Sequence, residues 1–217
     1  MARCQFESRI PELTANLVKL YRLAEPADIT DGFDWYPKAR RIVAEWSTTY
    51  DYHTSAVACV IAAISPQCEW TRNLIIADDV LADRPVSIGG ALHVNITKAR
   101  RLRDDSSLLQ LETGKRMVAV FPHGPKVTSF ALNLAGNDSA VTMDGHAMQA
   151  ALNNPRADYR LRWTPYLCFA QAYEAAAARL HVPSSTFQAV IWHVWKRLYP
   201  RMTKHAMRKQ WEPIGDY

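Results

Sequence analysis

Apolar residues recur at helical spacing in nearly every stretch of this chain that lies between two turn-forming residues. Leu13, Leu17 and Leu20, for example, fall on one face of a single helix. The segment His53–Ile64 is apolar nearly all round, which predicts a central, buried helix. No strand-rich region and no internal repeat stand out. The expected fold class is therefore all-α with short connections.

Helix-breaking residues and capping signals give the expected boundaries. A polar turn is expected over Asp28–Asp34, and one short extended run over Ala140–Met143. Ser184 or Ser185, directly after Pro183, is expected to cap the last helix. The expected helices are Ile10–Leu23, Tyr36–Thr48, His53–Ile64, Cys68–Leu81, Ala91–Arg103, Gly114–Val120, Lys126–Leu134, Gly145–Leu152, Pro165–Leu180 and Ser185–Leu198.

Composition narrows the class of protein further. With 48% hydrophobic and 22% charged residues, the chain is neither disordered, nor collagen-like, nor a coiled coil. Its 217 residues suffice to bury a core as one domain or as two small lobes. The net charge of +5 and the pI of about 9.1 fit a polyanionic partner, but many enzymes without such a partner are equally basic.

The cysteines favour a reducing compartment. Cys4, Cys59, Cys68 and Cys168 form no CxxC pair and no zinc spacing. Cys59 and Cys168 lie in apolar helical segments, so both are expected to be buried free thiols. The sequence shows no signal-peptide core and no apolar run of the ~20 residues that a membrane helix needs. A cytoplasmic protein without a membrane partner is therefore expected.

Two short helices are expected to meet at a tight Gly/Pro turn. The segment Gly114–Val120 precedes the turn Pro122–Pro125, and Lys126 opens the second helix. The free N–H groups and the dipole at the start of such a helix can hold a phosphate. Lys115 and Arg116 add positive charge nearby. A purely structural helical hairpin would show the same pattern.

A carboxylate at the end of the extended run is the second signal. Asp144 directly precedes the helix that begins at Gly145, so it either caps that helix or points into a cleft. It follows Lys126 by 18 residues, the length of one helix and a return segment. Such a length would bring the carboxylate back beside the lysine. A lysine beside a carboxylate in a partly dry cleft can act as a nucleophilic amine.

In order and spacing these motifs resemble the helix-hairpin-helix DNA glycosylases of the endonuclease III-like superfamily. Lys126 and Asp144 match that family's nucleophilic lysine and its carboxylate partner. The segment Ile61–Gln67 resembles a helix end whose glutamine enters the duplex, and Leu92–Ala99 resembles a further lysine-bearing helix start. The hairpin departs from the family pattern at its first glycine. The family's four-cysteine loop is missing, so no iron–sulfur cluster is expected.

Other segments are more similar to a phage-associated branch, the alpha-glutamyl/putrescinyl-thymine pyrophosphorylases, which act on hypermodified thymine in DNA. These segments are Ser65–Asn73 and Phe187–Trp192. The resemblance implies a two-lobed helical fold. Residues 50–138, with the hairpin at about 114–134, would form a six-helix lobe, and residues 1–49 plus 139–217 would form the other.

The function implied by the resemblance is excision of a modified pyrimidine, of the bulky 5-substituted phage type, from double-stranded DNA. The enzyme would flip the base out of the duplex. Asp144 would stabilise the developing sugar cation, and Lys126 would attack C1′ and permit an AP-lyase step. No cofactor, metal ion or obligate protein partner is implied, and defence against phages with modified DNA would follow. A transferase that adds an amino acid or polyamine to hypermodified thymine and a non-catalytic DNA-binding module are the alternatives.

The same motifs supply the expected binding residues, each with a structural alternative. Aromatic side chains are common in cores, and basic runs are common on solvated helix faces. The residues expected to contact DNA are Gln67, Trp70, Lys98, Lys115, Arg116, His123 and Gly124. The residues expected to line a base pocket are Ser65, Glu69, Asn73 and Trp192. Core packing is the favoured role of Trp163, Tyr166, Tyr173, Trp192 and Trp195, and His146 and His193 are expected to be structural.

Overall fold

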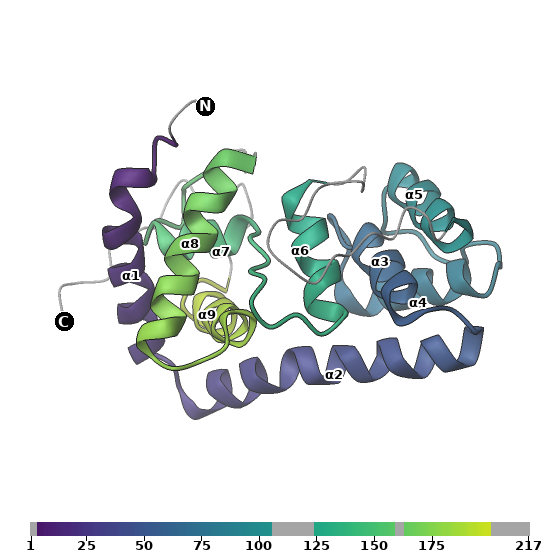
Figure 1. Ribbon diagram of the computed structural model, residues 1–217, viewed down its shortest axis with the longest axis horizontal. Coiled ribbons are helices and arrows are strands. Elements are labelled where there is room, and N and C mark those ends of the chain that lie inside the picture. Colours follow the sequence, from purple (N-terminus) through teal and green to yellow (C-terminus); the bar gives the residue numbers. More distant parts are fainter. Residues whose placement is uncertain (1–3, 106–123, 159–162, 201–217) are drawn as a thin grey trace. The chain divides into compact units, whose positions relative to one another are not determined.

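The computed structural model describes residues 4–105, 124–158 and 163–200, and all regular elements in these ranges are helices (Figure 1). The all-α expectation is thereby confirmed for the described residues. The chain divides into two compact units, each described here by itself: Met1–Tyr36 with Val141–Tyr217, and Pro37–Ala140. None of the described helices is both long and apolar enough to cross a membrane.

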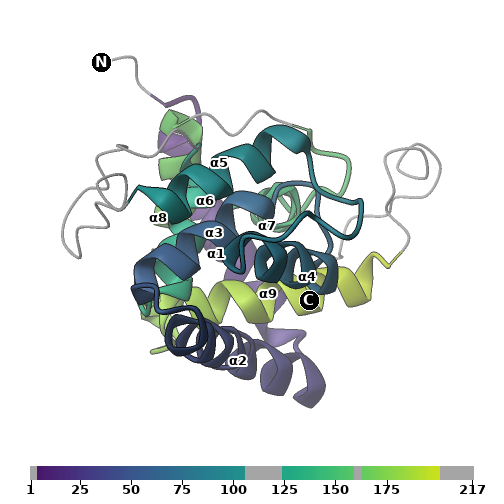
Figure 2. The same ribbon diagram turned by 90° about the vertical axis from the view of Figure 1, so that its right-hand side faces the viewer.

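The unit formed by residues 37–140 is built around α3 (Thr54–Ile64). Every side chain from Ala56 to Ile64 is buried, as the apolar sequence of this helix predicts. Three helices pack against α3 and cover it (Figures 1 and 2). They are α4 (Trp70–Leu81), α5 (His93–Asp104) and α6 (Pro125–Leu134).

The other unit has one continuous core of aliphatic and aromatic side chains. Its elements are η1 (Glu7–Arg9), α1 (Ile10–Arg22), α7 (Gly145–Ala151), α8 (Trp163–Arg179) and α9 (Ser184–Leu198). Tyr166, Tyr173 and Trp195 are buried in this core, as expected, whereas Trp192 is half-buried. The side chain of Trp163 lies outside the described part of the chain.

Helix α2 (Pro26–Tyr50) corrects the predicted polar turn at Asp28–Asp34, because those residues are helical. The carboxylate of Asp28 accepts a hydrogen bond from the backbone N–H of Glu25 and closes the first turn. It also pairs with Arg197 on α9 at 2.8 Å. These contacts offset the poor intrinsic helix propensity of the segment.

The packing around Gly32 explains why a glycine occupies the middle of α2. A Cβ atom at this position would lie 2.4 Å from Cγ2 of Val190 and 2.7 Å from its Cα. Only a residue without a side chain permits so close an approach of α2 to α9 within this unit. Gly32 is therefore a packing residue within the segment that was predicted to be a turn.

The start of α9 corrects a second prediction. Pro183 occupies the N-cap position, and Ser184 is already the first helical residue. Neither serine is thus the N-cap residue. A proline locks φ near the value required at a helix start, so the chain enters α9 without a side-chain cap.

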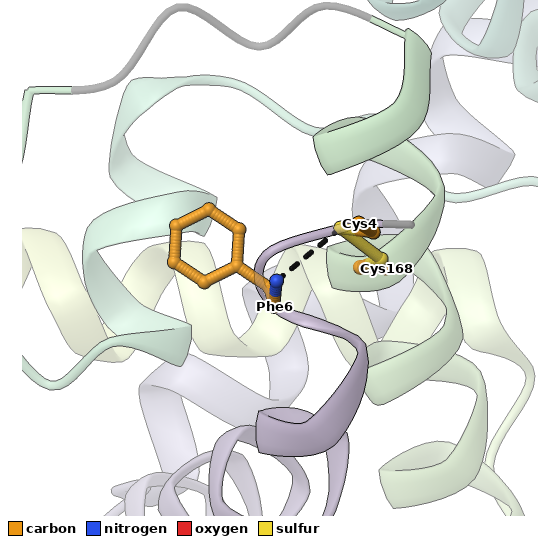
Figure 3. The surroundings of a disulfide bond; sticks show 3 residues. All are labelled: Cys4, Phe6 and Cys168. Atoms are coloured by element: carbon orange, nitrogen blue, oxygen red, sulfur yellow. Dashed lines mark hydrogen bonds between the residues drawn. A yellow bond between two sulfur atoms is a disulfide. The ribbon is translucent and has the colours of Figure 1, made fainter. Parts of the chain in front are cut away.

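Cysteine pairing corrects a third prediction. Cys4 and Cys168 are joined as a disulfide across a sequence separation of 164 residues (Figure 3). Cys168 is therefore not a free thiol. Cys59 is free and buried as expected, and burial raises the pKa of its thiol to about 12.

Candidate functional site

The start of α6 is well defined from Gly124 onward. Gly124 is the N-cap residue in an extended conformation, and Pro125 occupies the first turn of α6. Gly124 has no side chain, so the N-cap residue of α6 makes no side-chain capping hydrogen bond. Lys126 follows in the first turn and is half-buried. A cation in the first turn opposes the usual preference of a helix dipole for negative charge.

Trp70 lies against α6 on the face that carries Lys126. The Trp70 ring meets the ring of Phe130 edge to face, with the centroids 6.3 Å apart. Phe130 is one helical turn after Lys126, and side chains four residues apart share a helix face. The start of α4 therefore contacts the second turn of α6.

Three predicted base-pocket residues around the α3–α4 turn have structural roles. The Ser65 hydroxyl donates to the carbonyl of Ala62. Glu69 is the N-cap of α4, and its carboxylate accepts from the backbone N–H groups of Thr71 and Arg72. These hydrogen bonds lower the pKa of the Glu69 carboxyl.

Asn73 is the third of these residues and is fully buried. Its amide donates to the carbonyl of Ile61 at 3.1 Å and ties α4 to α3. Its Oδ1 atom is buried without a hydrogen-bond partner in the described structure. Leaving a buried oxygen without a hydrogen-bond partner is costly.

Gln67 differs from the other non-glycine residues that have a positive φ. Asp51, Asp83, Asn153 and His181 each follow the last turn of a helix and adopt φ between 45° and 55° there. Asp, Asn and His are the residue types that enter this region most readily. Gln67 has a φ of 60° and is exposed, but glutamine is not one of these residue types. Its unusual backbone makes it the strained point of the α3–α4 turn.

Lys98 lies on α5, in the same unit, and is half-buried. The buried face of this helix consists of Asn95, Ala99 and Leu102, so Lys98 flanks the core rather than entering it. Arg103 is held by Asp83 and Asp104 in ion pairs. Arg100 and Arg101 are the exposed basic residues of α5.

Asp144 is the N-cap of α7. Its Oδ1 atom accepts a hydrogen bond of 2.8 Å from the backbone N–H of Ala147. The capping alternative of the sequence analysis is thereby confirmed, and the carboxylate is half-buried. A capping role fixes where the side chain lies and leaves its second oxygen for other contacts.

A tyrosine that the sequence analysis assigned only to the core holds the segment that leads to Asp144. The hydroxyl of Tyr166 donates to the carbonyl of Val141 at 2.5 Å and accepts from the N–H of Met143 at 3.1 Å. We name these two hydrogen bonds the Tyr166 clamp. The only signal in the sequence was that a buried tyrosine hydroxyl needs a partner.

Tyr173 supports the same region from the next turns of α8. Its hydroxyl donates to the carbonyl of Ala147 at 3.0 Å. Burial, and then the negative charge of Asp144, raises the pKa of Tyr173 well above its usual value. The hydroxyl thus stays protonated and remains a donor beside Asp144.

Trp192 is distant in sequence from both helix starts and contacts a cation. The ammonium group of Lys196 lies 4.2 Å from the centre of the Trp192 ring. The next residue, His193, is half-buried, and its pKa is lowered mainly by burial. The Trp192 ring thus lies against a cation of its own helix, and its role in a base pocket stays a prediction.

The remaining predicted residues lie outside the described part of the chain. They are Lys115, Arg116 and His123, together with the first helix of the hairpin. The segments 1–3, 106–123, 159–162 and 201–217 contain nine of the chain's 26 Lys and Arg residues but three of its 21 Asp and Glu residues. The excess of positive charge thus falls in those segments.

The two predicted catalytic residues belong to different units, Lys126 to residues 37–140 and Asp144 to the other. No curated protein and no solved structure matches this sequence. A family of unknown function, DUF7178, matches residues 2–198. The chain therefore belongs to the DUF7178 family.

Proposed function

We propose that this protein is a DNA glycosylase that removes a modified pyrimidine from double-stranded DNA. The observation that carries the proposal is the start of α6. Lys126 lies there behind a Gly124–Pro125 entry without a side-chain cap, on the helix face that Trp70 touches through Phe130. An open helix start attracts a phosphate, a lysine supplies an amine, and an aromatic ring can stack on a base.

Lys126 is the proposed nucleophile. Its amine attacks C1′ of the flipped nucleotide and displaces the base, and the resulting Schiff base permits β-elimination at the abasic site. Asp144 is the proposed carboxylate partner that stabilises positive charge on the sugar. Its Oδ1 atom is used by the cap on Ala147, so Oδ2 is assigned to this role.

Gln67 and Trp70 are proposed to occupy the gap that the flipped base leaves in the duplex. Gln67 is exposed and its backbone is held in the left-handed region, and Trp70 opens the next helix. Filling that gap offsets an unstacking cost of a few kcal/mol. Gln67→Ala and Trp70→Ala should therefore reduce activity more than they reduce non-specific DNA binding.

Borohydride trapping tests the nucleophile. The protein is incubated with a panel of phage DNAs that carry modified pyrimidines, then reduced and analysed by denaturing gel. Wild type should give a covalent adduct. Lys126→Arg should give none, because it keeps the charge at the helix start but cannot form a Schiff base. An adduct with Lys126→Arg would contradict the assignment.

Asp144→Asn tests the carboxylate, since asparagine still caps a helix. Base release should fall by a factor of about 10² or more while the fold survives. Nucleoside mass spectrometry of the same reactions distinguishes a released base from a chemically altered base, which is the result that the transferase alternative requires.

A non-catalytic DNA-binding module is the second candidate. It is favoured by the cap on Ala147, which accounts for the Asp144 carboxylate without any chemistry. In that case no base is released from any DNA of the panel. Lys126→Ala then lowers DNA affinity and reduces the salt slope by about one, and Asp144→Asn changes neither.

A further inference from the structure

We propose that Cys4 and Cys168 form a reversible thiol–disulfide switch that controls the Tyr166 clamp. The inference rests on the proposed function only where it concerns activity. Its structural part concerns residues 4–36, 141–158 and 163–200, which form one described core.

The disulfide joins the segment before α1 to the second turn of α8 (Figure 3). Phe6, two residues after Cys4, is buried and lies against Phe169, with the ring centroids 4.8 Å apart. Its backbone N–H also points to the sulfur of Cys4 at 3.4 Å. The covalent bond and the aromatic contact therefore fasten the N-terminal segment to one face of α8.

The same part of α8 carries the Tyr166 clamp. Tyr166 is two residues before Cys168, and its hydroxyl holds Val141 and Met143. Phe6, Val141, Met143, Tyr166 and Cys168 all belong to one buried cluster. Reduction of the disulfide at Cys168 thus makes the first turns of α8 more mobile, and these turns position the segment that ends at Asp144.

The cysteines differ in accessibility, which sets the direction of attack. Cys4 is half-buried, whereas Cys168 is 6% exposed. A thiolate of a small-molecule thiol attacks the sulfur of Cys4, and the S–S bond breaks with its electron pair on Cys168, which takes up a proton. A second small thiol then resolves the mixed disulfide on Cys4. Two protein thiols and one small-molecule disulfide result, with two electrons transferred to the protein.

The other two cysteines are natural controls. Cys59 is buried with a strongly raised pKa, so it should resist both alkylation and exchange. Cys68 is half-buried at the α3–α4 turn and belongs to the other unit. Cys68→Ser therefore removes a thiol without touching the switch.

The test combines thiol alkylation with hydrogen exchange in buffers of defined glutathione ratio. In the oxidised buffer, native protein should bind no maleimide at Cys4 or Cys168, and reduction should expose both together. The amide of Met143 should then exchange at least about tenfold faster. Cys4→Ser should exchange at this faster rate in both buffers, and Cys68→Ser should behave as wild type.

Two results would overturn the switch: alkylation of Cys4 and Cys168 in the oxidised buffer, or equal exchange of Met143 in both buffers. Base release should be lower in the reduced protein. If thiol state and exchange change as expected but neither form releases a base, the switch stands and the glycosylase proposal fails.

Discussion

The helices α6 and α7 begin in opposite ways. At α7, the carboxylate of Asp144 binds the N–H of Ala147, so a negative charge of the chain itself closes the helix start. At α6, the N-cap residue is Gly124 and the first turn carries Lys126. Among the described residues, one helix start therefore has an anionic side chain, and the other has none where the helix dipole favours one.

This difference suggests that the start of α7 contributes to stability, whereas the start of α6 sacrifices stability. The carboxylate of Asp144 caps α7, so any chemical role for it is additional to a structural role. The arrangement at Gly124 and Lys126 gives up helix stability, which is a feature of sites that bind an external group. Substitutions at the two helix starts should therefore have opposite effects on the free energy of unfolding.

The largest expected effect is on the support of the α7 start. Tyr166→Phe leaves the carbonyl of Val141 and the N–H of Met143 without partners in the core. We expect a loss of about 2 kcal/mol in the free energy of unfolding, measured by urea denaturation. Tyr173→Phe, which frees only the carbonyl of Ala147, is the matched control and should cost about half as much. Equal losses would show that the clamp adds nothing beyond an ordinary buried hydroxyl.

Removal of the cap at α7 should have the next largest effect. Asp144→Ala should cost about 1 kcal/mol in the free energy of unfolding, because the N–H of Ala147 loses its acceptor. Asp144→Asn should cost much less, since its amide oxygen can also accept the hydrogen bond from the N–H of Ala147. If Asp144→Ala is as stable as wild type, the cap is not important for stability and the comparison with α6 fails.

Addition of a cap at α6 should act in the opposite direction. Gly124 has the extended conformation of an N-cap residue, and a Cβ there would meet no atom within 4 Å. Gly124→Asp should stabilise the protein by about 0.5 kcal/mol. If the protein binds DNA as proposed, this variant should also bind DNA more weakly, because the new carboxylate would lie where the proposal puts a phosphate. Gly124→Ala adds a Cβ in the same space without a capping group, so it separates the effect of the carboxylate from that of the added side chain. If Gly124→Asp binds DNA as tightly as wild type, the start of α6 does not bind a phosphate.

The smallest expected effect is that of the cation itself. Lys126→Gln removes positive charge from the first turn of α6 and should stabilise the protein by about 0.3 kcal/mol. Arg41→Gln, at an exposed position in the interior of α2, is the control and should change the free energy of unfolding less. Destabilisation by Lys126→Gln would mean that the half-buried lysine has a structural partner.

The sequence predicted most helices because their apolar spacing is a local property. α3 was expected to end at Ile64 and α6 to end at Leu134, and both do. The failures occur where distant residues decide the outcome. The segment Asp28–Asp34 reads as a turn, yet it is helical because Arg197 pairs with Asp28 and Val190 packs on Gly32.

The candidate site divides in the same way. The sequence located Asp144 and Lys126 at helix starts, and the structure confirms both positions. Residue type alone did not distinguish a ligand from a structural group. Glu69 is a cap and Asn73 ties two helices together, because partner atoms from Thr71 and Ile61 lie opposite them.

The sequence by itself determined the helical class, the positions of most helices and the central burial of α3, since periodicity and breaking residues act over a few neighbours. Only the tertiary structure decided the bond between Cys4 and Cys168, the Tyr166 clamp and the close approach at Gly32. Each of these joins residues far apart in the chain. Their geometry depends on how whole helices pack, which no local pattern of residues specifies.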